Sequence, residues 1–302
     1  MRPRARRPRR GNGEQVTGPR TAVVTGAGSG IGACVTERLA LEGWEVHAVA
    51  RTPEHLDRLG AGGNVHPVHA DIRSDCDVAR LVEHVAARTE RLDALVNGAG
   101  VLVAGTVGAT PVDVWDAAVQ TNFLGTLRVT QGLLGLLAHR GGRIVTLSSV
   151  AASVSVSPQG PYAASKAALE VAMETLAQDL ASCGARVTIL QPGIVATAIH
   201  ERFPQGSETL DADGLRLGLR LASFVRSQLR DHPTTPEQVA DRVVQVIDDA
   251  DPPLRATIGS DAFSLAAGRS RSSDTEWSDW WGNADDTSWR DGFLVRTGMA
   301  AP

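Results

Sequence analysis

The chain has 302 residues, 42% of them hydrophobic, and a net charge of −4 at pH 7. This length and apolar content suit one α/β domain with additions, and they allow a sizeable core. No apolar run approaches the roughly 18 residues of a membrane-spanning helix, so no membrane span is expected. Seven arginines gather in residues 1–20, and the remaining, acidic chain has no basic footprint for nucleic acid.

The N-terminal residues 1–19 are rich in arginine, proline and glycine, and we interpret them as a disordered tail. A polyanion-binding arm is the alternative. Cys34, Cys76 and Cys183 are scattered and lack any metal-ligand spacing. Free thiols in a reducing, cytoplasmic protein are therefore expected, and no metal site is.

A strand, a glycine turn and a helix follow one another from Thr21 to about Leu41. Glycines in such a turn let backbone N–H groups approach a pyrophosphate, and the helix N-terminus adds its positive dipole end. The pattern predicts a dinucleotide cofactor, since the glycines stand in the strand–turn–helix context that this site requires. The turn residues expected to contact it are Gly26, Gly28, Ser29, Gly30, Ile31 and Gly32.

A second strand, residues 45–50, is followed by Arg51. The NAD version of this fold places an acid here to bind the ribose 2′-hydroxyl, whereas a guanidinium suits a 2′-phosphate. The sequence therefore favours NADP(H) over NAD(H). The alternative is a surface arginine in an arginine-rich chain.

Five more predicted strands alternate with helices. The strands span residues 65–70, 92–96, 143–147, 186–190 and 255–259, and the helices 75–89, 111–139, 163–180 and 236–249. This alternation predicts a three-layer Rossmann fold, a doubly wound parallel α/β sheet of about seven strands with helices on both faces. Ligands bind beyond the carboxyl ends of such strands, where Arg51, Asp71, Asn97, Ser149 and Pro192 are expected.

Tyr162 is the only tyrosine, and Lys166 is the only lysine among 30 basic residues. Residues four apart lie on one face of a helix, so the lysine can stand beside the phenol. Free tyrosine has a pKa of about 10, and a nearby ammonium favours the phenolate. The pair is a candidate acid/base centre, with two surface residues of no particular role as the alternative.

Two segments stand outside the alternation. Residues 194–232 interleave leucines and arginines and are expected to form a substrate lid of one or two helices over the catalytic domain, residues 20–267. Residues 268–302 form a C-terminal extension with four tryptophans. Because exposed apolar patches usually mark interfaces, we expect these rings to pack over the lid or against a partner subunit, with the partner favoured.

Several motifs in this order resemble the short-chain dehydrogenase/reductase family, in its short single-domain branch with a Y-x-x-x-K site. The resemblance runs from about Arg20 to Asp261. It rests on TGAGSGIG (25–32), Asp71, NGAG (97–100), Asn122, the Ser149/Tyr162/Lys166 set and PG-x-x-x-T (192–197). The family's usual Asn-Asn-Ala-Gly is here Asn-Gly-Ala-Gly, a change at a mostly structural position, Gly98.

The resemblance implies roles for these residues. Tyr162 would be the general acid/base, Ser149 would polarise the substrate oxygen, and Lys166 would lower the Tyr162 pKa and hold the nicotinamide ribose. Asn122 would order a helix that supports a water-linked proton path. Ser149 is preferred to Ser148 because it lies at the family's common spacing before the tyrosine. The further cofactor contacts implied are Asp71 to the adenine, Thr197 to the nicotinamide amide, and Ile72, Asn97, Ala99, Gly100, Pro192, Gly193 and Ile194.

The function expected is reversible hydride transfer between NADP(H) and a carbonyl or secondary alcohol of a mostly apolar small molecule, in a homodimer or homotetramer. Two alternatives remain. A non-catalytic nucleotide-binding regulatory or scaffold protein could use the same fold, since fold does not imply function. An epimerase or dehydratase with bound NAD would expect a larger sugar-nucleotide domain than residues 194–302 offer.

Overall fold

The computed structural model describes residues 18–57, 59, 63–138, 141–197, 210–282, 285–300 and 302. The tail predicted for residues 1–19 lies outside the described residues except for its last two positions. Residues 198–209 of the predicted lid lie outside them as well.

A seven-stranded parallel sheet forms the centre of the molecule, with the order β3-β2-β1-β4-β5-β6-β7. The strands are β1 Thr21–Thr25, β2 Glu45–Ala50, β3 Val65–His69, β4 Ala94–Asn97, β5 Arg143–Leu147, β6 Arg186–Pro192 and β7 Arg255–Ile258. The order reverses direction at β1, which pairs with β2 on one side and β4 on the other. Ligands bind at this kind of switch point, so the topology places the candidate site beyond Thr25.

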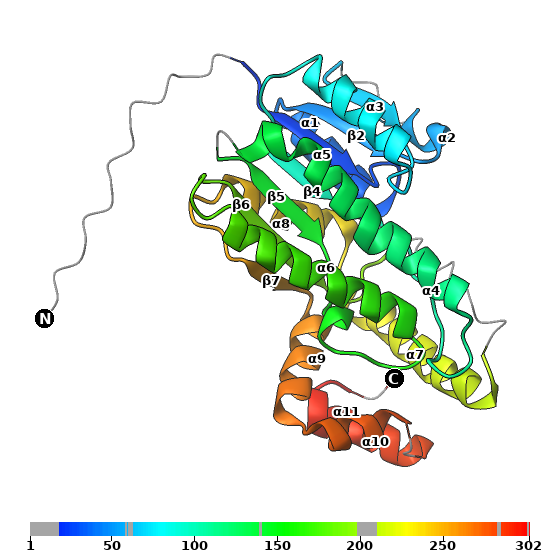
Figure 1. Cartoon of the computed structure of the whole chain (residues 1–302). Helices are drawn as coiled ribbons and strands as arrows, with labels where there is room; N and C mark the ends of the chain where they lie inside the picture. Colours follow the sequence, from blue (N-terminus) through cyan, green and yellow to red (C-terminus); the bar gives the residue numbers. More distant parts are fainter. Residues whose placement is uncertain are drawn as a thin grey trace, which may run out of the picture.

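Helices cover both faces of the sheet, which confirms the predicted three-layer fold (Figure 1). One face packs on α1 Gly30–Leu41 and α8 Pro236–Asp248, with the short α2 Pro53–Leu56 beside them. The other face packs on α3 Asp75–Ala86, α5 Thr126–Ala138 and α6 Gly160–Asp179. The central strands read as continuous apolar runs because both of their faces are buried.

The helix predicted over residues 111–139 is three segments in the structure. These are α4 Val112–Ala118, a π-helical turn η2 Val119–Gly125, and α5. A Cβ on Gly125 would lie 2.8 Å from the Ile72 side chain, so the glycine allows close packing where the π-turn ends. Single π-turns inside α-helices are frequent at functional sites, and this one carries Asn122.

The C-terminal part forms three helices at one end of the molecule: α9 Ser260–Arg271, α10 Asp274–Gly282 and α11 Asp286–Thr297 (Figure 1). Helix α9 runs through the predicted boundary between residues 267 and 268. The segment 194–232 contributes one described helix, α7 Ala212–Asp231.

All four tryptophans of this extension are buried within their own chain, each at most 4% exposed. They form an apolar cluster with α7 and with the segment after β5. We expected these rings to pack on a partner subunit, and this is wrong. They are buried against the apolar side chains of α7 in their own chain.

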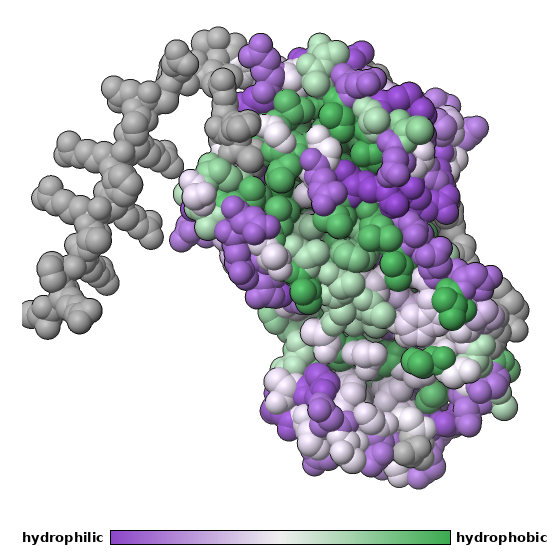
Figure 2. Space-filling model, in the orientation of Figure 1, coloured by the Kyte–Doolittle hydropathy of each residue, from purple (hydrophilic) through white to green (hydrophobic). Residues whose placement is uncertain are grey.

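Cys34, Cys76 and Cys183 are all free thiols. Among the described residues, none of the helices combines the length and apolarity needed to cross a bilayer. Figure 2 shows apolar residues across the middle of the face formed by α5 and α6, with hydrophilic residues at its margins.

Candidate active site

A cavity of about 480 Å³ opens at the carboxyl ends of the central strands. The glycine turn and the loop after β4 line one part of it, and the segment after β5, α6 and the loop after β6 line another. Of the predicted site residues, it brings together Gly26, Gly28, Ser29, Gly30, Ile31, Gly32, Ala99, Gly100, Ser149, Tyr162, Lys166, Pro192, Gly193, Ile194 and Thr197. Segments far apart in the sequence thus meet in one site.

The glycine turn fits a diphosphate group. Ser29 is the N-cap residue of α1, yet its side chain makes no capping hydrogen bond, and the first turn holds no acid. The first N–H groups of the helix therefore keep their positive end facing the cavity. Gly26 has φ +70°, and a Cβ there would lie 2.8 Å from the backbone of Ala99, so only glycine lets these two loops approach each other.

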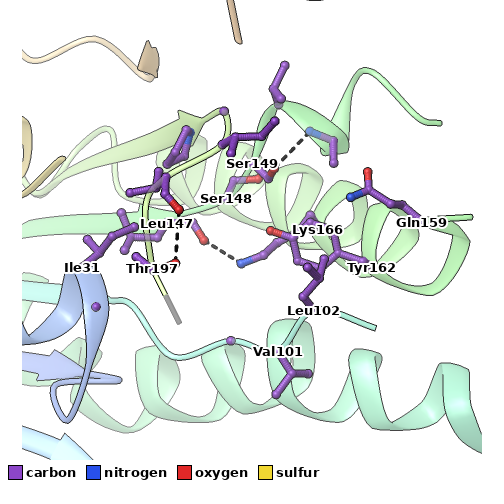
Figure 3. A pocket seen from close by; sticks show the side chains of 18 of the residues that line it. Ile31, Val101, Leu102, Leu147, Ser148, Ser149, Gln159, Tyr162, Lys166 and Thr197 are labelled. Atoms are coloured by element: carbon purple, nitrogen blue, oxygen red, sulfur yellow. Dashed lines mark hydrogen bonds between the residues drawn. The ribbon is translucent and has the colours of Figure 1, made fainter. Parts of the chain in front are cut away.

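Tyr162 and Lys166 lie side by side near the start of α6 (Figure 3). The lysine Nζ is 5.9 Å from the centre of the tyrosine ring and donates a 2.8 Å hydrogen bond to the Leu147 carbonyl at the end of β5. Ser149, two residues later, accepts a 3.2 Å hydrogen bond from the Ala151 amide. The end of β5 and the first turns of α6 therefore bring a hydroxyl, a phenol and an ammonium together.

Burial has the largest effect on the pKa values of Tyr162 and Lys166. It raises the pKa of Tyr162 above its ordinary value, and a hydrogen bond with Ser149 acts in the opposite direction. Burial also lowers the pKa of Lys166 to about 8, against the opposing charge of Glu170. The expected lowering of the Tyr162 pKa is therefore not found in this arrangement, because burial of the phenol outweighs the effects that favour its charged form.

Asn122 is fully buried and joins three segments of the site. Its side chain accepts a 2.8 Å hydrogen bond from the Val101 amide, donates one of 2.9 Å to the Val101 carbonyl, and donates another of 2.9 Å to the Ser165 hydroxyl. Ser165 in turn donates to the Tyr162 carbonyl at 2.7 Å. Asn122 thus ties the loop after β4 to the helix that carries Tyr162.

Ser148 also lines the cavity, but its hydroxyl is bonded to a buried carboxylate. Its hydroxyl donates a 2.6 Å hydrogen bond to the buried carboxylate of Glu170, so this hydroxyl is engaged by a side chain of α6. Gln191 donates to the same carboxylate at 3.0 Å. Both serines line the cavity, but only Ser149 forms a side-chain hydrogen bond with Tyr162 among the described residues.

Four predicted cofactor contacts lie at or just beyond the carboxyl ends of strands but do not line the cavity: Arg51, Asp71, Ile72 and Asn97. Arg51 is exposed, and its charge favours the ionised form of Asp71. Asp71 itself makes a salt bridge with Arg73 at 2.5 Å, which holds the pKa of that carboxyl below its usual range. Asn97 is buried, and its Oδ1 has no hydrogen-bond partner among the described residues.

Other lining residues were not found from the sequence. Asp261, only 2% exposed, accepts a 2.7 Å hydrogen bond from the Ile194 amide, and burial raises its pKa. The apolar lining comes from the segment after β5, α7 and the C-terminal helices, and includes Val150, Val154, Val156, Leu221, Phe224, Val225, Leu265 and Trp281. His55 and Gln159 also line the cavity. These side chains belong to segments without a local motif, so only the fold reveals them.

Comparison with known proteins places this arrangement in a family. The model of the short chain dehydrogenase family matches residues 20–208. A 3-oxoacyl-[acyl-carrier-protein] reductase of Thermotoga maritima is 32% identical over 205 residues, which cover 66% of this chain and 83% of that protein. A serine 3-dehydrogenase of Rhizobium radiobacter is 36% identical over 181 residues, covering 59% of this chain and 72% of that protein.

Among solved structures, a short-chain dehydrogenase from Streptomyces avermitilis is similar with a TM-score of 0.76 and 29% sequence identity. The match covers 87% of this chain and 96% of that one. The family match extends over more than half of the chain and includes the glycine turn, Ser149, Tyr162 and Lys166. The chain therefore belongs to the short-chain dehydrogenase/reductase family of NAD(P)-dependent oxidoreductases.

Proposed function

We propose that this protein is an NADP(H)-preferring oxidoreductase that interconverts a carbonyl and a secondary alcohol on a mostly apolar small molecule. The observation that carries the proposal is the convergence of Ser149, Tyr162 and Lys166 in the cavity that the glycine turn opens. A regulatory or scaffold role is not favoured, because the relatives are named for dehydrogenase and reductase activities.

The cofactor and the side chains of the site have different roles in the proposed reaction. The nicotinamide supplies or accepts the hydride, and the chain binds, orients and moves the proton. In the reducing direction the Tyr162 hydroxyl donates its proton to the substrate oxygen, which Ser149 holds by a hydrogen bond. A phenol with a raised pKa keeps that proton at neutral pH. Lys166 supplies positive charge beside the phenol as it ionises and binds the nicotinamide ribose.

Asn122 supports this pair indirectly. It fixes the π-turn and the loop after β4 against α6, and we propose that it thereby orders the water-linked proton path to Lys166. The remaining contacts proposed for the cofactor are the glycine turn at the diphosphate, Asp71 and Ile72 near the adenine, and Thr197 at the nicotinamide amide. A Cβ on Gly30 would lie 3.2 Å from the Thr197 methyl, so Thr197 lies next to the glycine turn.

The direct test of the activity is a panel of ketones and secondary alcohols, followed by the absorbance of the reduced nicotinamide. The apolar lining predicts that ketones with a bulky apolar body react better than small polar ones. Absence of turnover with every member, although NADPH binds, would contradict the proposed activity.

The cofactor preference rests on the end of β2. Arg51 follows that strand, no acid stands there, and the nearby Asp71 is paired with Arg73. A 2′-phosphate would therefore meet positive charge without an unpaired carboxylate beside it. This supports NADP(H) over NAD(H).

We predict that Arg51→Ala weakens NADPH binding about 10- to 150-fold, which corresponds to about 1.5–3 kcal/mol for one charged hydrogen bond. NADH binding should stay nearly unchanged, because NADH lacks the 2′-phosphate. Titration of nicotinamide fluorescence measures both dissociation constants. Arg242→Ala, which removes an arginine bonded to Gln245 within α8, is the matched control. Equal losses for the two cofactors would contradict the role of Arg51.

We also propose a homodimer or homotetramer, with the apolar face of α5 and α6 as one contact surface (Figure 2). Val171 on α6 is 64% exposed there.

Val171→Asp should lower the mass found by light scattering, because it places a charge in the contact. Leu41→Asp on α1, 83% exposed on the opposite side of the sheet, should leave the mass unchanged. A wild-type mass of one chain would refute the oligomer.

A further inference from the structure

The segment between Ser149 and Tyr162 makes much of the substrate side of the cavity. Val154, Val156 and Gln159 line it. Apart from the 3₁₀ turn η3 Val150–Ala152, the segment has no regular structure, so its position depends on contacts with other parts of the chain. The contacts that hold this segment therefore affect the shape of the substrate side of the cavity as well as the fold.

Two tryptophans of α10 bond this segment through their indole N–H groups. Trp281 Nε1 donates to the Ser157 carbonyl at 2.8 Å, and Trp277 Nε1 donates to the Ser155 carbonyl at 3.3 Å. The two tryptophans are four residues apart, so they project from the same face of the helix. The Trp281 ring also lines the cavity, so the C-terminal extension reaches the site itself.

Helix α10 is in turn fixed to α7. Arg220 on α7 is only 5% exposed and donates a 3.1 Å hydrogen bond to the Trp281 carbonyl. It also makes a 2.8 Å salt bridge with Asp286, and its guanidinium carbon lies 5.3 Å from the centre of the Trp289 ring. Arg216 donates to the Gly282 carbonyl at 2.9 Å. Trp281 is thus held at its backbone from one side and at its indole nitrogen from the other.

We propose that Trp277 and Trp281 are positioning residues that set the substrate side of the active site. Their indole N–H groups fix the backbone of residues 155–157, and this places Val154 and Val156 against the apolar body of the substrate. The Trp281 ring completes the same wall. The inference rests on the proposed function for its substrate, whereas the contacts themselves belong to the fold.

The glycine turn that faces the cofactor lies on another part of the cavity, and none of these indoles bonds it. The positioning role therefore predicts a separation of effects. Loss of an indole N–H should change how the carbonyl substrate binds and leave the affinity for NADPH unaltered.

The test compares Trp281→Phe with Trp289→Phe. Both replacements keep an aromatic ring in the same cluster, but only the first removes a donor to residues 155–157, since Trp289 Nε1 has no hydrogen-bond partner among the described residues. We expect amide hydrogen exchange in residues 153–159 to accelerate about 2- to 10-fold in Trp281→Phe, the effect of one lost hydrogen bond. Trp289→Phe should leave these amides at the wild-type rate.

Kinetics give the second measurement. With the ketone that the panel finds to react best, Trp281→Phe should raise KM more than it lowers kcat, while the NADPH dissociation constant stays within about twofold of wild type. Equal changes in exchange and in KM for both variants would overturn the proposal and leave the cluster a purely structural one. Should Trp281→Phe fail to fold, Trp277→Phe provides the same comparison through its longer hydrogen bond.

The two hypotheses fail in different ways. If no ketone reacts but the exchange of residues 153–159 still distinguishes Trp281→Phe from Trp289→Phe, the contacts are established and the proposed oxidoreductase activity is refuted. If ketones react and neither measurement distinguishes the variants, the activity stands and the positioning role is refuted.

Discussion

Replacing Tyr162 with phenylalanine should reduce kcat at least about 100-fold, because a positioned general acid or base commonly contributes about 10²- to 10⁴-fold. The ring stays in place, so packing at the start of α6 is retained and NADPH should bind with nearly the wild-type dissociation constant. Steady-state kinetics with the best ketone and a fluorescence titration of NADPH measure the two effects.

Thr175→Val is the matched control for this change. It removes a hydroxyl from the same helix, one that donates to the Val171 carbonyl at 3.0 Å and, within the described part of the chain, does not line the cavity. Its kcat should equal that of the wild type. A Tyr162→Phe variant that keeps more than a tenth of the wild-type kcat would refute the general acid/base assignment.

The lone tyrosine permits a direct measurement of its own ionisation. The near-ultraviolet absorbance of tyrosinate reports Tyr162 alone, since the chain has no other tyrosine. In the protein without cofactor, the phenolate should appear at a higher pH than in free tyrosine, because burial raises the pKa of Tyr162. An apparent pKa below that of free tyrosine would contradict the burial argument.

The central strands of the sheet could be predicted because each is a short, largely apolar run bounded by polar residues or glycines. The predicted strands at residues 21–25, 45–50 and 143–147 match β1, β2 and β5 residue for residue. The start of β4 and the end of β6 each differ from the prediction by two residues, because hydrogen bonding to neighbouring strands decides where a strand begins and ends, and hydropathy does not report this. The π-turn at Val119–Gly125 was not predictable, since no local motif marks it and the close approach of Gly125 to Ile72 is visible only in the fold.

The candidate site likewise has a part that the sequence predicts and a part that only the fold reveals. Local motifs mark the glycine turn and the Tyr162–Lys166 pair, and the fold brings both to one cavity. The apolar wall has no such motif, because α7 and α10 reach it only through tertiary packing. The tryptophans stand out in the sequence as a group, but no local pattern distinguishes Arg220, the buried arginine of α7 that forms a salt bridge with Asp286.

Lys166→Met should lower kcat/KM for the ketone roughly 10- to 1,000-fold at pH 7, the range that follows when a neighbouring charge shifts a pKa by about 1–3 units. Methionine keeps much of the apolar stem and removes the positive charge. Lys166→Arg keeps a charge, although its planar fork does not reproduce a compact ammonium. It should therefore retain more activity than the methionine variant, and equal activity of the two would show that charge is not what Lys166 contributes.

The pH dependence provides an independent check on Lys166. Burial lowers its pKa from 10.5 to about 8, so the folded chain loses this proton at a lower pH than the unfolded chain does. Between these values the unfolded state binds more protons, and the free energy of unfolding rises with pH. The wild type should therefore gain stability relative to Lys166→Met from about pH 8 to pH 10.5, as measured by denaturant unfolding. A difference between the two proteins that stays constant over this range would mean that Lys166 titrates normally and is not desolvated in the site.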